Sequence, residues 1–363
     1  MSDKIPSIDE LLSVAVANGA SDLHLRAGSP PTLRVDGELR GFAGRALSEP
    51  EVELYLQALL PDRLEVEFKQ GHEADFAYGL SDGSRFRVNA YRQRGLVSLA
   101  IRALKPPSGD FASLGLPAVL ESIAAEPRGL VLVTGPTGSG KSTTLAALVD
   151  HINTTQRRNI ITVEDPIEVL HRDKLSMVSQ REVGVDTGSF AEAMRRVLRQ
   201  DPDVIMIGEM RDAETIDAAL KAAETGHLVL SSLHTLDAAE TINRILDFFA
   251  SEQQRQARLL LAGTLRAILS QRLLPRADGQ GRIPAVEVLV NTDRVAERIA
   301  DAALTHEIPD LIAEGSFYGM ETFDQSILRL ASAGLVSWDD AFRHATRPSD
   351  LKLRAQQLGV LGT

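Results

Sequence analysis

The sequence predicts an α/β protein with two domains, the second of which contains a parallel β-sheet with helices on both faces. From residue 129 onward, short apolar runs alternate with amphipathic stretches of helical length, which is the order of elements in such a sheet. At 363 residues, the chain also exceeds the size of roughly 250–300 residues at which a single hydrophobic core stops growing. We expect the strands of the second domain at 129–134, 159–163, 204–207, 227–233 and about 283–290.

Residues 1–105 have a mixed α/β pattern of their own that ends in a β-hairpin. The segment between Gly83 and Lys105 holds five arginines and no acidic residue, and its apolar residues alternate with polar ones at period two. One face of the hairpin is therefore predicted to be apolar and the other lined by arginine. The two helices and two strands expected before it lie near 7–18, 49–60, 22–25 and 32–35.

A proline-rich stretch follows the hairpin and separates the two domains. Its sequence over 105–110, Lys-Pro-Pro-Ser-Gly-Asp, cannot continue a strand, because proline has no amide donor. We assign 106–110 to a linker and 111–363 to the second domain, which ends in a helical segment from about 291 to 363.

The composition restricts the kinds of site that the chain can contain. It has no cysteine, which excludes disulfides, thiolate zinc sites and thiol catalysis. No apolar run approaches the roughly 18 residues of a membrane-spanning helix, and the N-terminus lacks a signal-peptide core. The net charge of −11 argues against nucleic-acid binding. We expect a cytoplasmic protein that associates with a membrane only through a partner.

Residues 135–143 form a complete Walker A sequence between an apolar strand and a helix. Its glycines let the backbone bend around phosphates with the N–H groups pointing inward, and the following helix adds its positive N-terminus. Lys141 is placed to contact the β and γ phosphates, and Ser142 to hold Mg²⁺. We predict that ATP and Mg²⁺ are bound by Gly135, Pro136, Thr137, Gly138, Ser139, Gly140, Lys141, Ser142 and Thr143.

Acidic residues follow two of the predicted strands at their carboxyl ends, where nucleotides bind in parallel sheets. The strand 159–163 is followed by Glu-Asp-Pro-Ile-Glu over 164–168. The strand 204–207 is followed by Gly208 and Glu209, a Walker B sequence in which glycine replaces the usual aspartate. Carboxylates at these places can hold Mg²⁺ or orient the attacking water. For the first segment, an exposed acidic turn is the alternative.

Two histidines, His227 and His234, lie at the two ends of the next predicted strand. Their separation by seven residues places them on opposite faces of a strand, which argues against a shared metal ion. His234, at the carboxyl end, is placed to hydrogen-bond the γ phosphate. For His227, spacing alone favours a packed polar role.

Four segments together resemble the secretion-type AAA-like ATPases. They are the Walker A loop, Val-Glu-Asp-Pro-Ile-Glu at 163–168, Gly-Glu-Met-Arg-Asp at 208–212, and Gly-His-Leu-Val-Leu-Ser-Ser-Leu-His-Thr at 226–235. Further segments are similar to the type IV pilus retraction ATPases within that superfamily, so the match spans nearly the whole chain. They include Ala-Ser-Asp-Leu-His-Leu at 20–25 and Gly-Met-Glu-Thr-Phe-Asp-Gln at 319–325.

The resemblance implies a PAS-like N-terminal domain, a RecA-like P-loop ATPase domain and a ring of six subunits. It makes Glu168 the general base, with Glu164 or Glu209 as the alternative base, and gives Glu209 the contact to Mg²⁺ or water. It also implies functional roles for His227 and His234. The implied partner is the inner-membrane platform protein of a type IV pilus, which would hold the chain at the inner face of the cytoplasmic membrane.

The same resemblance gives a role to the arginine face. Arg87 and Arg102 match positions that reach the γ phosphate across a domain interface, and Arg85 is a third candidate. An arginine on a separate domain that reaches the triphosphate only on closure couples hydrolysis to motion. A solvated surface or a nucleic-acid patch is the alternative.

Other functions stay open at this point. An accessory retraction paralogue or another secretion-type ATPase would share these motifs, although assembly and secretion ATPases typically carry a tetracysteine zinc insertion. A RecA-like nucleic-acid motor would bind strands on the arginine face. The sequence departs from the retraction branch at 294–301, but its apolar spacing predicts an amphipathic helix over 294–304 with Arg294, Glu297 and Arg298 outward.

Overall fold

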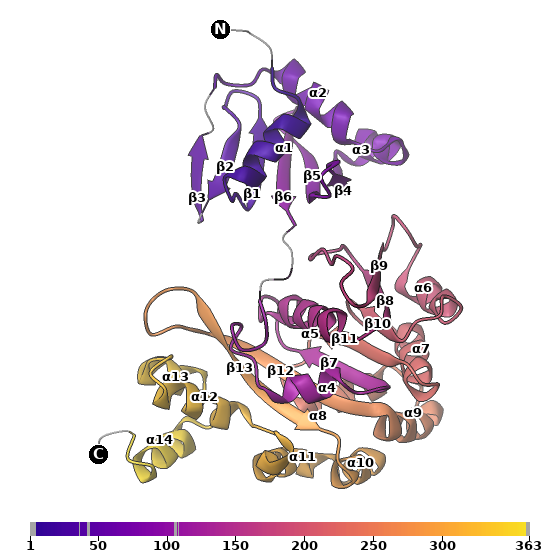
Figure 1. Ribbon diagram of the computed structural model, residues 1–363, viewed down its shortest axis with the longest axis vertical. Helices are drawn as coiled ribbons and strands as arrows, with labels where there is room; N and C mark the ends of the chain where they lie inside the picture. The colour runs from indigo at the N-terminus through magenta and orange to yellow at the C-terminus, as the bar shows by residue number, and fades with distance from the viewer. Residues whose placement is uncertain (1–4, 36, 42–43, 105–106, 108, 361–363) are drawn as a thin grey trace. The chain divides into compact units, whose positions relative to one another are not determined.

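The computed structural model describes residues 5–360 except 36, 42–43, 105–106 and 108, so part of the predicted linker lies outside the described residues. The chain divides into two compact units, 1–106 and 107–363 (Figure 1). Each unit contains a β-sheet with helices packed against it, which confirms the predicted α/β class. No helix in the described part of the chain is long and apolar enough to cross a membrane.

The first unit is built on an antiparallel sheet whose described strands run in the order β3-β2-β1-β6-β5-β4. Apolar residues of one sheet face form a core with helices α1, α2 and α3. The strands are β1 (Asp22–Arg26), β2 (Thr32–Val35), β3 (Glu38–Gly41), β4 (Glu73–Gly79), β5 (Arg85–Gln93) and β6 (Leu96–Ala103). The helices are α1 (Ile8–Ala17), α2 (Glu49–Leu59) and α3 (Glu65–Gly71).

The predicted hairpin is formed by β5 and β6. Phe86, Val88 and Ala90 point into the core and are at most 1 % exposed. Since successive side chains of a strand alternate between faces, Arg85 and Arg87 lie on the opposite face. Arg92 is instead on the core side, where its guanidinium lies over the Phe68 ring and pairs with Glu53 of α2 at 3.3 Å. Arg87 and Arg102 are directly opposite each other in the register.

The second unit contains a sheet with the strand order β13-β12-β7-β11-β10-β8-β9 in the described residues. All neighbours pair in parallel except β12 and β13, which are antiparallel. The strand leading to the Walker A loop, β7, is therefore flanked by parallel strands on both sides. The strands are β7 (Gly129–Thr134), β8 (Asn159–Glu164), β9 (Met177–Glu182), β10 (Val204–Ile207), β11 (Leu228–Leu233), β12 (Leu265–Pro275) and β13 (Arg282–Val290).

The prediction of a wholly parallel sheet is thus wrong at one edge, and two strands were not predicted. In β12, apolar residues at 265, 268, 269 and 273 also fit a helical spacing. Pairing with β7 on one side and β13 on the other makes the segment a strand. The strand β9 lies at the other edge, and only two of its residues, Met177 and Val178, are apolar.

Helices cover both faces of this sheet, as predicted. In β7, Leu130 and Leu132 contact one helical layer, whereas Val131 and Val133 contact the other. The first layer contains α6 (Phe190–Val197), α7 (Ala213–Glu224), α8 (Ala238–Asp247), α9 (Ser251–Thr264), α10 (Asp293–Ala300) and α11 (Ile308–Glu314). The second contains α4 (Val119–Ala124) and α5 (Lys141–Thr155).

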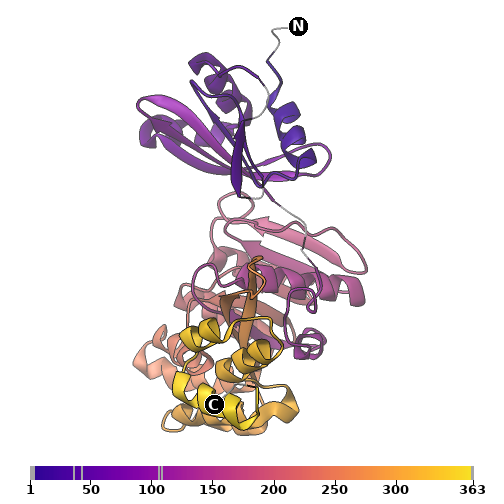
Figure 2. The same ribbon diagram turned by 90° about the vertical axis from the view of Figure 1, so that its left-hand side faces the viewer.

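The chain ends in a separate helical cluster, drawn in yellow in Figure 2. Its helices α12 (Phe323–Ser332), α13 (Trp338–His344) and α14 (Pro348–Gln357) share a small core with the outer ends of β12 and β13. The helix predicted over 294–304 is shorter than expected, because α10 ends at Ala300. Asp301 is extended there, and its side chain accepts a hydrogen bond from the Ala303 amide at 2.9 Å.

Candidate active site

A pocket of about 490 Å³ lies at the carboxyl ends of the parallel strands. It is lined by the Walker A loop, the loop after β8, the loop after β10 and the end of β11. The predicted residues that line it are Thr137, Gly138, Gly140, Lys141, Ser142, Thr143, Glu164, Glu168, Glu209 and His234. Segments far apart in the sequence therefore meet where a nucleotide binds in an open α/β sheet.

The Walker A loop needs glycine for both conformation and space. Gly135 has a φ of 140°, and a Cβ atom there would lie 2.5 Å from the carbonyl oxygen of Gln271 on β12. Gly140 has a φ of 94° and is the N-cap of α5, where it offers no side chain to the first amides of the helix. These amides are available for phosphate oxygens at the positive end of the helix dipole.

Lys141 is held in the loop by oxygen and nitrogen acceptors. Its Nζ donates to the carbonyl oxygens of Gly135 at 2.8 Å and Pro136 at 3.1 Å, and it lies 3.3 Å from Nδ1 of His234. Burial lowers the pKa of Lys141, and the charges of Glu209 and Glu168 oppose that shift. In the described part of the chain, no carboxylate forms an ion pair with Nζ, so this buried ammonium is available to a phosphate.

His234 links Lys141 to Glu209. Its Nε2 lies 3.1 Å from Oε1 of Glu209, while the other carboxylate oxygen accepts from Arg211 at 2.8 Å. Because an ammonium group can only donate, Nδ1 of a neutral His234 accepts from Lys141, and Nε2–H donates to Glu209. Burial alone raises the pKa of Glu209, but Arg211 and His234 lower it below the ordinary value. The Glu209 carboxylate is therefore ionised at neutral pH.

The two glutamates after β8 have different surroundings. Glu164 is buried, and its Oε1 accepts from Thr162 Oγ1 at 2.7 Å and from Gln180 Nε2 at 3.0 Å. Burial is the main reason that its pKa is raised. Glu168 is exposed within the pocket lining. Both carboxylates line the pocket, and Glu168 is the more exposed of the two.

His227 lies at the amino end of β11 and does not line the pocket. Its Nδ1 lies 3.0 Å from the carbonyl oxygen of Ala222 and 3.4 Å from Thr225 Oγ1, at the end of α7. These contacts agree with the packed role that the spacing favours. The functional role implied by the resemblance stays a prediction.

The arginine face belongs to the first unit and forms part of a charged row across its sheet. Arg34, Asp22, Arg102 and Arg87 are successive partners on neighbouring strands. Arg102 pairs with Asp22 at 2.9 Å, and Arg87 lies 3.7 Å from Asp75 on β4. The side chains of Arg102 and Arg87 stay 67 % and 46 % exposed. Both guanidinium groups can therefore still contact an anion.

The oxygen groups near Lys141 suit Mg²⁺. Magnesium is usually held by one or two protein oxygens together with substrate phosphates and water. Ser142 and Glu209 supply a hydroxyl and an ionised carboxylate on the same pocket. Among the described residues, there is no cluster of three or more His, Asp or Glu side chains that could hold a metal without substrate.

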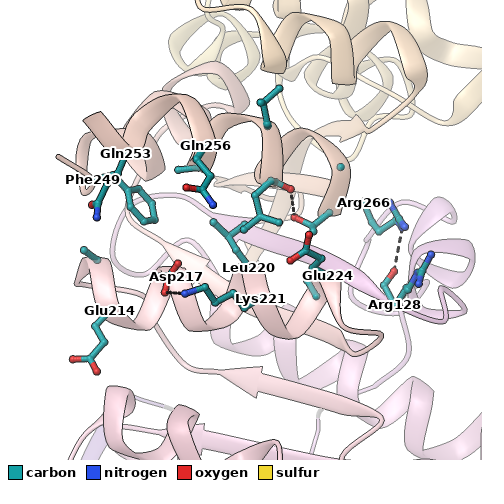
Figure 3. Close-up of a pocket in the computed structure, with 17 residues that line it drawn as sticks. Arg128, Glu214, Asp217, Leu220, Lys221, Glu224, Phe249, Gln253, Gln256 and Arg266 are labelled. Atoms are coloured by element: carbon teal, nitrogen blue, oxygen red, sulfur yellow. Dashed lines mark hydrogen bonds and ion pairs between the residues drawn. The ribbon is translucent and has the colours of Figure 1, made fainter. Parts of the chain in front are cut away.

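A larger pocket, of about 810 Å³, lies between α7 and α9 and contains none of the predicted site residues (Figure 3). It is at the amino ends of β7 and β12, away from the edge where α/β sheets bind nucleotides. Two of its cationic side chains already have partners, since Lys221 pairs with Asp217 at 2.6 Å and Arg266 Nε donates to the Arg128 carbonyl at 3.1 Å. Its place at the amino ends of the strands argues against a nucleotide site.

Comparison with known proteins identifies the family. The model of the family described as type II/IV secretion system protein matches residues 2–342. The chain belongs to this family. It is 42 % identical over 343 residues to the Pseudomonas aeruginosa protein named type IV pilus retractation ATPase PilT, covering 94 % of this chain and 99 % of that protein.

Two further relatives support the same branch of the type II/IV secretion family. The P. aeruginosa type IV pilus ATPase PilU is 39 % identical over 95 % of this chain and 90 % of its own length. A crystal structure of the pilus retraction motor PilT with bound ADP superposes with a TM-score of 0.86 at 41 % identity, covering 96 % of this chain and all of that one. The predicted family resemblance is confirmed.

Sequence reasoning missed several polar residues near the pocket. Gln180 and Glu182 were missed because β9 was not predicted, and Gln271 because β12 was not. Arg211 was part of a quoted motif, but its ion pair with Glu209 could not be read from spacing. His171 also lines the pocket, and burial lowers its pKa to about 4. None of these residues carries a sequence signal strong enough to single it out.

Proposed function

We propose that this chain is an ATP hydrolase that works as a ring of six subunits and powers retraction of a type IV pilus. The observation that carries the proposal is the 42 % identity to PilT over 99 % of that protein. The pocket supports hydrolysis independently, because it combines a phosphate loop, an available lysine and two carboxylates.

The proposal gives a role in hydrolysis to the Walker A loop and to the main polar side chains of the pocket. The amides of the Walker A loop and Lys141 bind the β and γ phosphates and hold them in line for attack. Glu168, the exposed carboxylate, accepts a proton from the attacking water, while His234 contacts the γ phosphate. Ser142 and Glu209 would hold Mg²⁺, which would supply positive charge to offset that of the phosphates.

In this proposal, the arginine face couples ATP hydrolysis to motion. We propose that residues 1–105 and 111–363 act as separate domains, and that Arg87 and Arg102, with Arg85 as a third, contact the triphosphate when an interface closes. Two arginines directly opposite on a sheet repel each other by a few tenths of a kcal/mol to about 1 kcal/mol. A surface that keeps this repulsive pair exposed is suited to binding an anion.

The proposed partner is the platform protein of a type IV pilus in the inner membrane, and the proposed location is the cytoplasmic face of that membrane. Deletion of the gene in its host should leave surface pili present or more numerous and abolish twitching movement. Unchanged pilus number and motility in the deletion strain would show that the ATPase serves another machine.

An accessory retraction ATPase is the second candidate, because PilU is nearly as similar as PilT. Deletion of an accessory ATPase should weaken retraction rather than abolish it. A nucleic-acid motor has less support, since the net charge of the chain is −11. Stimulation of ATP turnover several-fold by single-stranded DNA would favour that motor.

A further inference from the structure

Side chains of the edge strand β9 form hydrogen bonds with the backbone of the loop after β8. This loop, 165–171, carries Glu168 and forms one wall of the nucleotide pocket. Gln180 and Glu182 are two residues apart on β9 and therefore face the same side of the strand. Glu182 is buried, and its Oε2 accepts a hydrogen bond from the Ile167 amide at 3.3 Å.

The side-chain amide of Gln180 makes three hydrogen bonds to this loop and the residue before it. Its Oε1 accepts from the His171 amide at 2.8 Å, and its Nε2 donates to the Val169 carbonyl at 2.8 Å and to Glu164 Oε1 at 3.0 Å. The backbone partners determine which end of the amide is oxygen, because a carbonyl requires a donor and an N–H requires an acceptor. Both hydrogens of Nε2 are in use.

The carboxyl group of Glu164, which accepts a hydrogen bond from Gln180, also interacts with the backbone of Glu168. Glu164 accepts hydrogen bonds from Thr162 and from Gln180, and the backbone of Glu168 is close enough to lower the pKa of its carboxyl group. One glutamine thus joins the residue before the loop, Glu164, to its last residues, and Glu168 lies between these attachments. Since the Glu168 side chain itself is exposed, its position depends on how firmly this backbone is held.

We propose that Gln180 is a positioning residue for Glu168, which keeps its carboxylate directed at the attacking water. This inference rests on the proposed function, in which Glu168 is the general base. Gln180 is not among the residues that line the pocket, so its loss acts on the chemical step and not on nucleotide binding. A displacement of a catalytic group by about 1 Å can cost about 100-fold in rate.

The test is a double-mutant cycle on the purified full chain, with kcat and KM for ATP measured alongside nucleotide affinity. Gln180→Leu should lower kcat by roughly 10- to 100-fold and change KM and affinity by less than about twofold. In a Glu168→Gln background, the same substitution should lower kcat by less than about twofold, because the group it positions is gone. Ser179→Ala, on the exposed side of β9, is the control and should match the wild type.

Three results would overturn the inference. An equal loss of kcat in both backgrounds means that Gln180 does not act through Glu168, and a loss confined to nucleotide affinity means that it supports binding. If Glu168→Gln leaves kcat unchanged, the general-base assignment itself fails, and the positioning role falls with it. The single variant Glu168→Gln therefore separates failure of the proposed function from failure of the positioning role.

A second variant covers the case in which Gln180→Leu does not fold. Gln180→Glu keeps the size of the side chain and the acceptor for His171, but it loses both donors and places a carboxylate beside Glu164. Its kcat should be low at neutral pH and should recover relative to the wild type as pH falls and the new carboxyl group is protonated. A wild-type kcat for Gln180→Glu at all pH values would contradict the positioning role.

Discussion

At the residue scale, the central feature is the chain of contacts from Lys141 through His234 to Glu209. A lysine whose burial lowers its pKa and a glutamate whose partners keep it ionised are joined by one imidazole. A γ phosphate entering the pocket would take over the donors of Lys141, and His234 would be free to contact it. The site is therefore arranged to respond to the presence of the third phosphate.

We expect Glu209→Gln to bind ATP with near wild-type affinity but to hydrolyse it at least about 100-fold more slowly. Glutamine still accepts a hydrogen bond from His234, so the Walker A loop stays intact, but the negative charge for Mg²⁺ or water is lost. Nucleotide binding and steady-state turnover measure the two effects separately. Glu224→Gln, the same change on the exposed end of α7, is the control. Near-normal turnover of Glu209→Gln would remove this residue from the mechanism.

Arg87→Ala and Arg102→Ala should lower ATP turnover far more than ATP affinity, because an arginine finger acts mainly in the transition state and contributes about 10³- to 10⁵-fold. The Arg87–Asp75 pair is exposed on both sides and is worth at most about 1 kcal/mol, so Arg87→Ala should change the thermal stability little. In the Arg102–Asp22 pair the aspartate is only 12 % exposed, so Arg102→Ala should cost more stability. Arg26→Ala on the same sheet face is the control. A loss of affinity with normal turnover at saturating ATP would contradict the finger role.

At the element scale, the partly buried Glu287 of β13 accepts a hydrogen bond from the amide of Ala238 at 2.9 Å, at the start of α8. Burial, with a smaller contribution from Asp237 and Asp324, raises its pKa to about 7, against the hydrogen bond from Ala238 and the charge of Arg272. The folded state therefore holds a proton that the unfolded chain loses near pH 4.5. The contribution of Glu287 to the free energy of unfolding therefore falls as pH rises from about 4.5 to about 7.

Glu287→Gln removes this titration and keeps an acceptor for Ala238. Its unfolding free energy should be close to that of the wild type near pH 5 and should exceed it increasingly up to about pH 8, by as much as roughly 3 kcal/mol. Denaturant unfolding of both proteins at several pH values measures the difference. A constant difference across this range would mean that Glu287 does not titrate there.

The outer face of α10 gives a second prediction at this scale. Arg294 and Glu297 are 66 % and 70 % exposed, but Arg298 is only 23 % exposed and pairs with Glu307 at 3.0 Å, so it is not the outward residue that the sequence predicts. Arg294→Ala and Glu297→Ala should leave ATPase activity within about twofold and abolish twitching. Arg298→Ala should instead lower thermal stability. Collapse of ATPase activity in the first two variants would place α10 in the catalytic ring.

Sequence patterns predicted the strands and helices that have a regular pattern of buried residues. They missed the elements whose structure depends on pairing with neighbouring strands. The strand Val204–Ile207, which the sequence predicts, is buried at every position. The edge strand β9 has too few apolar residues for such a signal. The tasks of Gln180 and Arg211 depend on which loops pack together, which a single sequence does not show.

At the scale of the whole molecule, the ATPase pocket lies in one unit and the arginine face in the other. Both are needed for a motor, because hydrolysis does work only when it is coupled to movement between parts. The family membership and the similarity to PilT support this assembly as a ring, and the platform protein would receive the motion. The central claim is that ATP hydrolysis by this chain drives retraction.

That claim is tested most directly by following single labelled pili in living cells of a deletion strain that carries either the wild-type gene or the Glu209→Gln variant at equal protein level. Pili should extend in both strains but shorten only in the strain with the wild-type gene. Retraction at the wild-type rate with the Glu209→Gln protein, once its ATPase activity is shown to be lost, would contradict the claim.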